Sequence, residues 1–227
     1  MTRLIDKTLA RFELKALLTD RLSLAQLLFW QWWLSGSVFG AKGVASPASA
    51  DALLWANYGL FICGAVAVMM AGVCVGFTLV KPRKYRMVEL MLASPLPLGR
   101  LITTTFSVCM AFSAGNLLLH LLVLRLRYGV VPYGYGFYAG LLAALSLAAF
   151  CLLGAVLLAL RRRDYDQLHY VLIVLGMLLW APIVFTHMRA QLPVWLAPSA
   201  AAFCLLGAAA LWRSAGRLVS KEQAVLA

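Results

Sequence analysis

The chain has 227 residues, of which 63% are hydrophobic and 12% are charged, and its formal net charge is +12. A soluble domain cannot bury that much apolar surface, whereas a lipid bilayer solvates it. The composition therefore excludes an ordinary soluble domain and predicts an all-α integral membrane protein. The positive charge needs no nucleic-acid partner, because basic residues beside membrane helices contact anionic lipids and set the orientation.

The first 21 residues have helical periodicity with charges of both signs. Ile5, Leu9, Phe12 and Ala16 share one face of the predicted helix. The remaining surface is largely covered by Arg3, Asp6, Lys7, Arg11, Glu13 and Lys15. Such a helix is suited to the headgroup region of a membrane, although an ordinary helix packed on a partner protein has the same pattern. Since these residues contain no continuous apolar run, we expect no cleaved signal peptide.

Six apolar segments follow within residues 22–212, and each is close to or above the roughly 20 residues that cross a bilayer as a helix. We therefore predict a six-helix transmembrane domain over 22–212 and a short tail over 213–227. The predicted spans are Leu22–Gly40, Ala52–Val80, Leu101–Leu124, Gly136–Leu160, Leu168–Thr186 and Val194–Trp212.

The distribution of Lys and Arg predicts the orientation of these spans. If the amino terminus is cytoplasmic, sixteen of the basic residues lie on the inner side and four on the outer side. The four outer residues are Lys42, Arg125, Arg127 and Arg189. Cytoplasmic segments of membrane proteins are enriched in Lys and Arg, so both termini and the segment between the second and third spans are predicted to be cytoplasmic.

That segment, residues 81–100, reads KPRKYRMVELMLASPLPLGR and has an unusual apolar centre around Glu89. Pro95 and Pro97 follow the apolar centre, so a short helix should end near Ala93, because proline disfavours helical backbone at the residue before it. A loop that only joins two spans is normally polar. An exposed apolar patch usually contacts a partner, so we predict a docking element here.

The spans carry few groups suited to catalysis. No Asp or Glu lies well within a predicted span, and His120 and His169 lie at or near span ends. The five cysteines are isolated in apolar runs, which is typical of small hydrophobic residues and indicates neither a disulfide framework nor a metal site. The chain also lacks the G-x-x-x-x-G-K-[ST] motif. An intramembrane enzyme is therefore disfavoured, and the chain has no P-loop of its own for ATP.

Some polar and aromatic residues within or beside the spans are candidates for a substrate path. The first span contains Gln26, Trp30, Gln31 and Trp33, and its tryptophans lie deeper than an ordinary aromatic belt. An outer segment rich in tyrosine and glycine contains Tyr133 and Tyr135. The alternative for both groups is an interfacial anchor. Small residues also recur at helix-packing spacing, as in Gly72-xxx-Gly76 and Gly136-xxx-Gly140.

Three short motifs resemble a known family. The residues from Glu89 to Leu98, ELMLASPLPL, resemble the "LEQLLATPL" signature of the type-2 ABC transporter permeases, the membrane subunits of bacterial ABC exporters. The segment FELKALLTDR, which starts at Phe12, is similar to the amphipathic amino-terminal helix of that family. The segment QLPVWL, which starts at Gln191, is similar to its external "lP.wl" segment. Arg86 and Met87 stand where the family usually has Gly-Thr.

The resemblance implies a role for two of these elements. In the family, the loop after the second span forms a coupling helix that docks on a separate ATPase subunit, and the amino-terminal connecting helix packs beside it. Carried over to this chain, the connecting helix contains Phe12 and Glu13. The docking residues would be Glu89, Leu90, Leu92, Ala93, Ser94, Pro95, Leu96 and Pro97.

The resemblance also implies the partners of the chain. It predicts a permease of the bacterial cytoplasmic membrane that works with two ABC ATPase subunits and a second permease copy, as a homodimer or heterodimer. ATP and Mg would be bound by the ATPase, and the chain itself would bind no cofactor. Because the spans lack buried charge, we expect an apolar, amphipathic or lipid-linked substrate. The alternatives are a non-transporting scaffold that works on a partner protein and a permease of the haem or cytochrome c maturation type.

Overall fold

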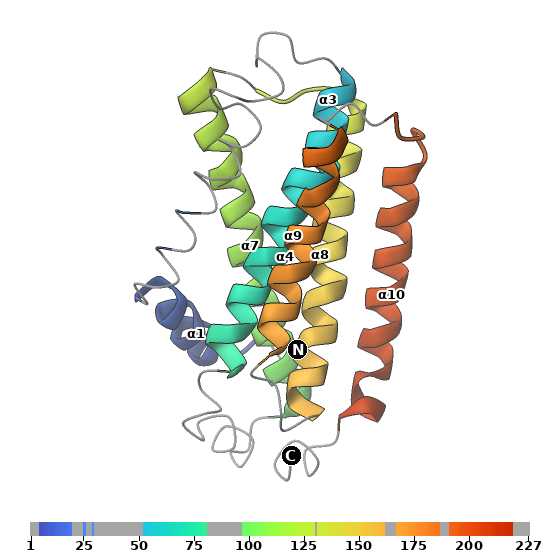
Figure 1. Ribbon diagram of the computed structural model, residues 1–227. Helices are drawn as coiled ribbons and strands as arrows, with labels where there is room; N and C mark the ends of the chain where they lie inside the picture. The colour runs from blue at the N-terminus through green and yellow to red at the C-terminus, as the bar shows by residue number, and fades with distance from the viewer. Residues whose placement is uncertain are drawn as a thin grey trace.

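The computed structural model describes residues 5–19, 25, 29, 52–80, 97–129, 131–161, 167–186 and 191–219, with the backbone alone at 168, 169, 180 and 182–186. All regular structure in these ranges is helical (Figure 1). Four elements, α3, η2, α4 and η3, follow one another without a break from Ala52 to Val80. The elements are α1 (Lys7–Thr19), α3 (Ala52–Asn57), η2 (Tyr58–Ile62), α4 (Cys63–Val75), η3 (Gly76–Val80), α7 (Leu98–Tyr128), α8 (Tyr135–Arg161), α9 (Leu168–Thr186) and α10 (Leu196–Leu218).

Four helices of the described ranges are long and apolar enough to cross a membrane: Ala52–Val80, α7, α8 and α10. This confirms the predicted class of helical membrane protein. The bounds of Ala52–Val80 and of α9 are those of the predicted second and fifth spans. The predicted first span lies outside the described residues except for positions 25 and 29, so the total of six spans stays a prediction.

The helix α4 lies at the centre of the bundle (Figure 1) and contacts α7, α8 and α9. All 13 of its residues are buried. In contrast, α10 packs mainly on α8, and only Ala201, Cys204 and Ala215 are buried among its 23 residues. The bundle therefore has a central helix enclosed by protein and a peripheral helix with most of its surface free for lipid.

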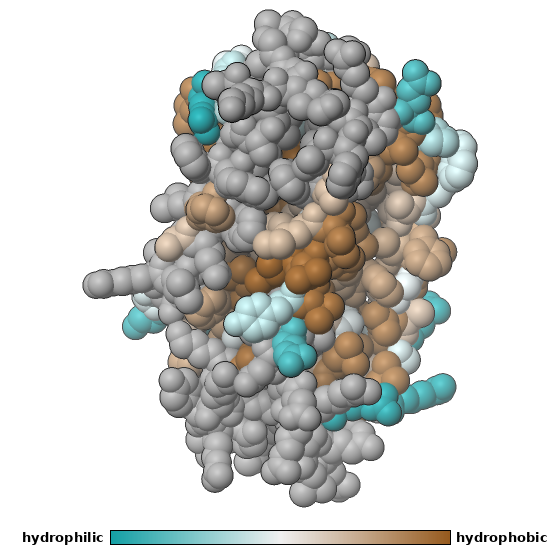
Figure 2. Space-filling view, viewed as in Figure 1, coloured by the Kyte–Doolittle hydropathy of each residue, from teal (hydrophilic) through white to brown (hydrophobic). Residues whose placement is uncertain are grey.

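The outward faces of the peripheral helices are strongly apolar. On α7, Leu118 and Leu126 are 68% and 76% exposed, and on α10, Phe203 and Leu206 are 73% and 72% exposed. Figure 2 shows hydrophobic side chains across the middle of the visible face, with hydrophilic side chains mainly toward its edges. Because lipid tails solvate apolar side chains, this arrangement is expected of a membrane-spanning bundle.

Glycines allow two helices to cross closely at one end of the bundle. A Cβ atom on Gly140 of α8 would lie 2.6 Å from the backbone nitrogen of Leu60 in η2. A Cβ on Gly59 would lie 2.5 Å from the carbonyl oxygen of Phe137, and one on Gly136 would lie 2.7 Å from the Cβ of Ala56. The predicted role of Gly136-xxx-Gly140 in close packing is confirmed. The turns of η2, at this crossing, are π-helical. Such turns are rare, and they are frequent at functional sites of helices.

Candidate functional site

Two helices are of special interest because they precede and follow residues 81–96, most of the predicted docking segment. The helix Ala52–Val80 ends where this range begins, and α7 starts just after Pro97. We call these two the flanking helices. Pro97 has an extended backbone, and its carbonyl oxygen accepts hydrogen bonds from the N–H groups of Arg100 and Leu101. Pro97 is therefore the N-cap residue of α7.

Two hydrogen-bonded contacts, one helical turn apart, join the flanking helices around the middle of α7. The Thr78 hydroxyl donates to the Cys74 carbonyl oxygen at 2.8 Å, so the Cys109 thiol is the donor in its 3.5 Å contact with Thr78 Oγ1. Further along α7, the Ser113 hydroxyl donates to the carbonyl oxygen of Ala67 at 2.8 Å. Each bond connects α7 to the helix Ala52–Val80 and satisfies a polar group in an apolar interior.

A third bond joins the flanking helices in their other half. Tyr58 and His120 are both fully buried, and the Tyr58 hydroxyl lies 2.6 Å from His120 Nε2. The two rings are also stacked, with centroids 5.9 Å apart. Asn57 and Asn116 are buried on the same two helices. Three hydrogen-bonded levels thus hold the flanking helices together.

The polar contacts between the flanking helices were not predicted from the sequence. The prediction placed His120 near a span end and assigned it no role, whereas the side chain is enclosed between helices eight residues before α7 ends. The signal was present in the spacing, because Ser113, Asn116 and His120 recur at three- and four-residue intervals and share one face of a helix. Polar residues with that period in an apolar helix indicate an interface with another helix.

The helix α1 packs on both flanking helices at the end where residues 81–96 are connected (Figure 1). Its buried residues Leu9 and Leu17 belong to one hydrophobic cluster with Leu79 and Val80 of η3 and with Leu101 and Ile102 of α7. We call this end of the bundle the α1 end. Through these contacts α1 bridges the ends of the two flanking helices that border residues 81–96.

Polar contacts fix the start of α1. The Asp6 side chain accepts hydrogen bonds from the N–H groups of Thr8 and Leu9, both at 3.0 Å. This is an N-terminal cap, which satisfies donors that have no partner inside the helix. The N–H of Asp6 itself donates to Thr104 Oγ1 at 3.0 Å and so attaches the cap to α7.

The next turn of α1 carries a buried acid. Glu13 is only 4% exposed, and its Oε1 accepts a hydrogen bond from the Thr105 hydroxyl at 2.6 Å. Its second oxygen, Oε2, is buried and has no hydrogen-bond partner among the described residues. Burial raises the pKa of the Glu13 carboxyl from 4.5 to about 7, and the bond from Thr105 acts in the opposite direction. The ionised form is disfavoured because burial deprives its charge of water.

The predicted polar surface of α1 was wrong at Glu13, which is buried. Leu9, Glu13 and Leu17, spaced by four residues, form the buried face. Ile5 and Phe12, which were predicted on the apolar face, are 43% and 44% exposed. The prediction sorted residues by chemical type, and a charged residue was therefore assigned to solvent. The connecting-helix role of Phe12 and Glu13 stays a prediction.

Most of the predicted docking residues lie outside the described residues. Of the set, only Pro97 is described, at the start of α7. The other members are Glu89, Leu90, Leu92, Ala93, Ser94, Pro95 and Leu96.

The residues predicted to line a substrate path are not brought together in the described ranges. Gln26, Trp30, Gln31 and Trp33 lie outside them. Tyr133 and Tyr135 are described at or just before the start of α8 and are 56% and 69% exposed. Their exposure is compatible with both interpretations of this segment, a substrate path and an interfacial anchor.

Neither a metal site nor a disulfide is found in the described ranges. They contain no group of three or more His, Cys, Asp and Glu side chains placed to hold a metal ion. The five cysteines are free, and four of them are buried. What this part of the chain does provide is a hydrogen-bonded pair of flanking helices with α1 attached at one end.

Comparisons with known proteins give no match to a protein-family model, to a curated protein or to a solved structure. The class of the chain therefore follows from its own residues. An all-helical chain with four helices long and apolar enough to cross a bilayer has the character of a membrane protein.

Proposed function

We propose that the chain is the membrane subunit of an ATP-driven exporter, in which residues 81–100 dock on a separate ATPase subunit. In this role it acts with a second permease copy and two ATPase copies. The ATPase binds ATP and Mg and supplies the movement, and the spans respond to it. The proposed family, the type-2 ABC transporter permeases, rests only on the resemblance of the motifs around Glu89 and Phe12.

The observation that carries the proposal is the way the flanking helices are joined. A docking loop can pass movement to a bundle only if the helices that it connects respond together. Here the two helices share three hydrogen-bonded levels, and α1 packs across both of them at the loop end. This is the mechanical arrangement that a coupling loop needs.

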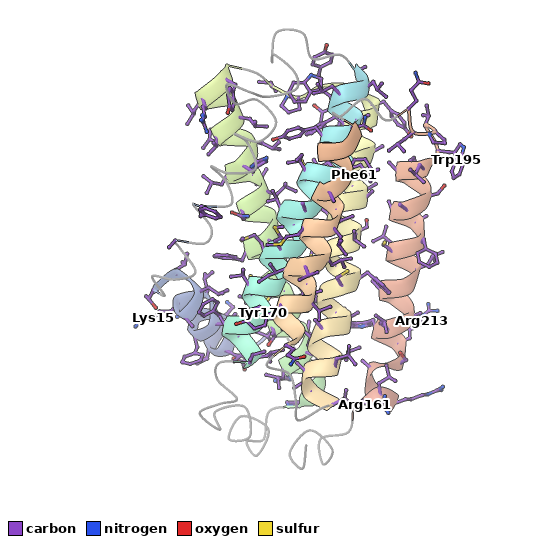
Figure 3. All side chains as sticks on the ribbon, in the orientation of Figure 1. Lys15, Phe61, Arg161, Tyr170, Trp195 and Arg213 are labelled. Carbon is purple, nitrogen blue, oxygen red and sulfur yellow. The ribbon has the colours of Figure 1, made fainter. Side chains whose placement is uncertain are left out.

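The charge pattern supports a cytoplasmic position for the α1 end. Figure 3 shows Lys15, Arg161 and Arg213 toward this end of the bundle, whereas Trp195 lies at the other end. Basic residues mark the cytoplasmic side of membrane proteins, and tryptophan is enriched at the interfaces. With this orientation, residues 81–100 face the compartment that contains ATP.

The character of the interior supports an apolar, amphipathic or lipid-linked substrate. No Asp or Glu occurs in Ala52–Val80, α7, α8 or α10. An ionic substrate or a proton pathway normally requires ionisable groups within the membrane, and these are retained despite a cost of roughly 2.5–3.5 kcal/mol each.

Purification of the tagged full-length chain from the membranes of its native host tests the proposal. We expect a P-loop ATPase to copurify in mild detergent and to hydrolyse ATP. The double variant L90D/L92D should insert normally and lose the ATPase. The matched control is V131D, which places an acid at an exposed apolar position near the start of α8 and should keep the ATPase.

Two results would contradict the proposal. One is a purified wild-type complex that never contains a nucleotide hydrolase, and the other is full retention of the hydrolase by L90D/L92D. Reconstitution into vesicles separates transport from the scaffold alternative. Flux of an amphipathic or lipid-linked compound, together with stimulated ATP hydrolysis, supports transport, whereas nucleotide-dependent release of a partner protein without flux supports the scaffold.

A further inference from the structure

The buried carboxyl of Glu13 has a structural setting that the proposed function does not use. We propose that Glu13 is a proton-binding site whose occupancy sets how firmly α1 is docked against α7 and η3. The proposal does not rest on the proposed function, because it concerns a contact within this chain and needs no ATPase.

The geometry of the site favours a neutral carboxyl when α1 is docked. Glu13 is almost fully enclosed, Thr105 supplies one hydrogen bond to Oε1, and no donor in the described part of the chain reaches Oε2. A carboxylate with an unsatisfied oxygen in such a place retains the full cost of lost hydration. A protonated carboxyl avoids most of that cost, so the docked state binds a proton more tightly than the undocked state.

Among the residues that the structure describes, the groups that pack around Glu13 supply no compensating positive charge. The cations of α1, Lys7, Arg11 and Lys15, are exposed on its other face. In the half of α7 that is nearer to α1, the titratable groups are Arg100 and Cys109. On α4, Cys74 interacts electrostatically with the Glu13 carboxyl. The residues of η3 are Gly-Phe-Thr-Leu-Val and include no titratable side chain. The influences on the pKa of Glu13 are burial and the Thr105 bond, with no cation among them.

The direction of the pH effect follows from the two states. Undocked Glu13 has the ordinary pKa of 4.5, and burial raises the pKa of docked Glu13 to about 7. Below the lower value both states are protonated, and docking has its full strength. Docking then weakens by about tenfold per pH unit as the pH rises toward 7, by about 300-fold in all, and stays constant above that. Neutral solution at the α1 end therefore loosens α1, and acid holds it.

The proton can be observed directly in the full-length chain in phospholipid nanodiscs. The chain has three glutamates, Glu13, Glu89 and Glu222, so carboxyl-labelled glutamate gives few carbon-13 resonances to titrate. We expect one resonance with a midpoint near pH 7 that is absent from E13Q. In T105V the midpoint should move higher, because the hydroxyl that stabilises the carboxylate is lost. Titration of all three glutamates below pH 5 would overturn the proposal.

Docking can be measured in the same sample by hydrogen exchange of the α1 amides, corrected for the intrinsic effect of pH. The Asp6 N–H is the most direct reporter, because it bonds Thr104 of α7. Protection in the wild type should fall about tenfold per unit between pH 5 and 7. E13Q should stay protected with no such slope, and the control K15Q, a charge change on the exposed face, should follow the wild type.

Three exchange results would refute the proton site. They are a flat wild-type profile, an unchanged slope in E13Q, and loss of protection in E13Q at every pH. The last result would show that Glu13 is only a packing contact. None of the three bears on whether an ATPase binds residues 81–100, so the two proposals fail separately.

Discussion

The crossing of η2 and α8 gives the sharpest test of the packing. Replacing Gly140 by alanine adds one methyl group at a place where the nearest atoms belong to the backbone of another helix. The new Cβ would lie 2.6 Å from the nitrogen of Leu60 and 2.8 Å from the carbonyl carbon of Gly59. Ordinary contact begins at 3.4 Å, so the two backbones must separate by about 0.8 Å to relieve the clash.

The expected cost of G140A follows from that displacement. Excess volume in a packed interior typically costs about 1–3 kcal/mol, and substitution of glycine by alanine in a helix contributes about 0.4–1 kcal/mol in the opposite direction. We therefore expect the free energy of unfolding to fall by about 1–2 kcal/mol. Gly154, on the same helix, is the matched control. A Cβ there would meet only the Cδ1 atom of Leu211, at 3.9 Å, so G154A should be neutral or stabilising.

The assay is reversible unfolding of the full-length chain in bicelles, monitored by tryptophan fluorescence or by steric trapping. The two variants carry the same chemical change on the same helix, so their difference isolates the steric clash with η2. If G140A and G154A have equal free energies of unfolding, the close crossing of these helices is wrong.

Further predictions concern other contacts. In the double variant A56G/G136A the methyl group moves from one helix to the other, and we expect it to recover most of the stability that G136A loses in the same unfolding assay; no recovery would contradict the 2.7 Å contact. The variant D6A removes the cap of α1 and should weaken this helix by about 1 kcal/mol, seen as faster hydrogen exchange in its first turn. The variant Y58F removes the hydroxyl bonded to His120 and should cost about 1 kcal/mol on unfolding in bicelles, and an unchanged value would show that the bond contributes little.

The spans that hydropathy defines well could be predicted from the sequence. The helix Ala52–Val80 and α9 have the bounds that the apolar runs indicate, because charged segments or turn residues stop those runs. The π-helical turns could not be predicted, because π-helical and α-helical turns have no separate sequence signature in an apolar segment. The spacing of Gly136 and Gly140 indicated close packing, but it did not indicate which helix packs there.

The polar interior was harder to predict. Glu13 is a charged residue on a short charged helix, and hydropathy alone assigns it to solvent. Its burial depends on how α7 and η3 approach α1 and on the presence of a hydroxyl donor at Thr105. His120 is similar, because its partner Tyr58 is 62 residues away and no local pattern links the two. Contacts of this kind depend on tertiary packing, which could not be predicted from one sequence.

Whether a push on residues 81–96 slides the flanking helices past each other depends on how their bonds are distributed. One bond would act as a pivot, but Cys109, Ser113 and His120 contact the partner helix over a rise of about 16 Å along α7. Bonds at three heights resist both sliding and rotation, although each contributes only about 0.6 kcal/mol on average. The enclosure of α4 by α8 and α9 adds resistance from the other side. A displacement at the α1 end should therefore reach Tyr58 and His120 as a movement of the two helices together.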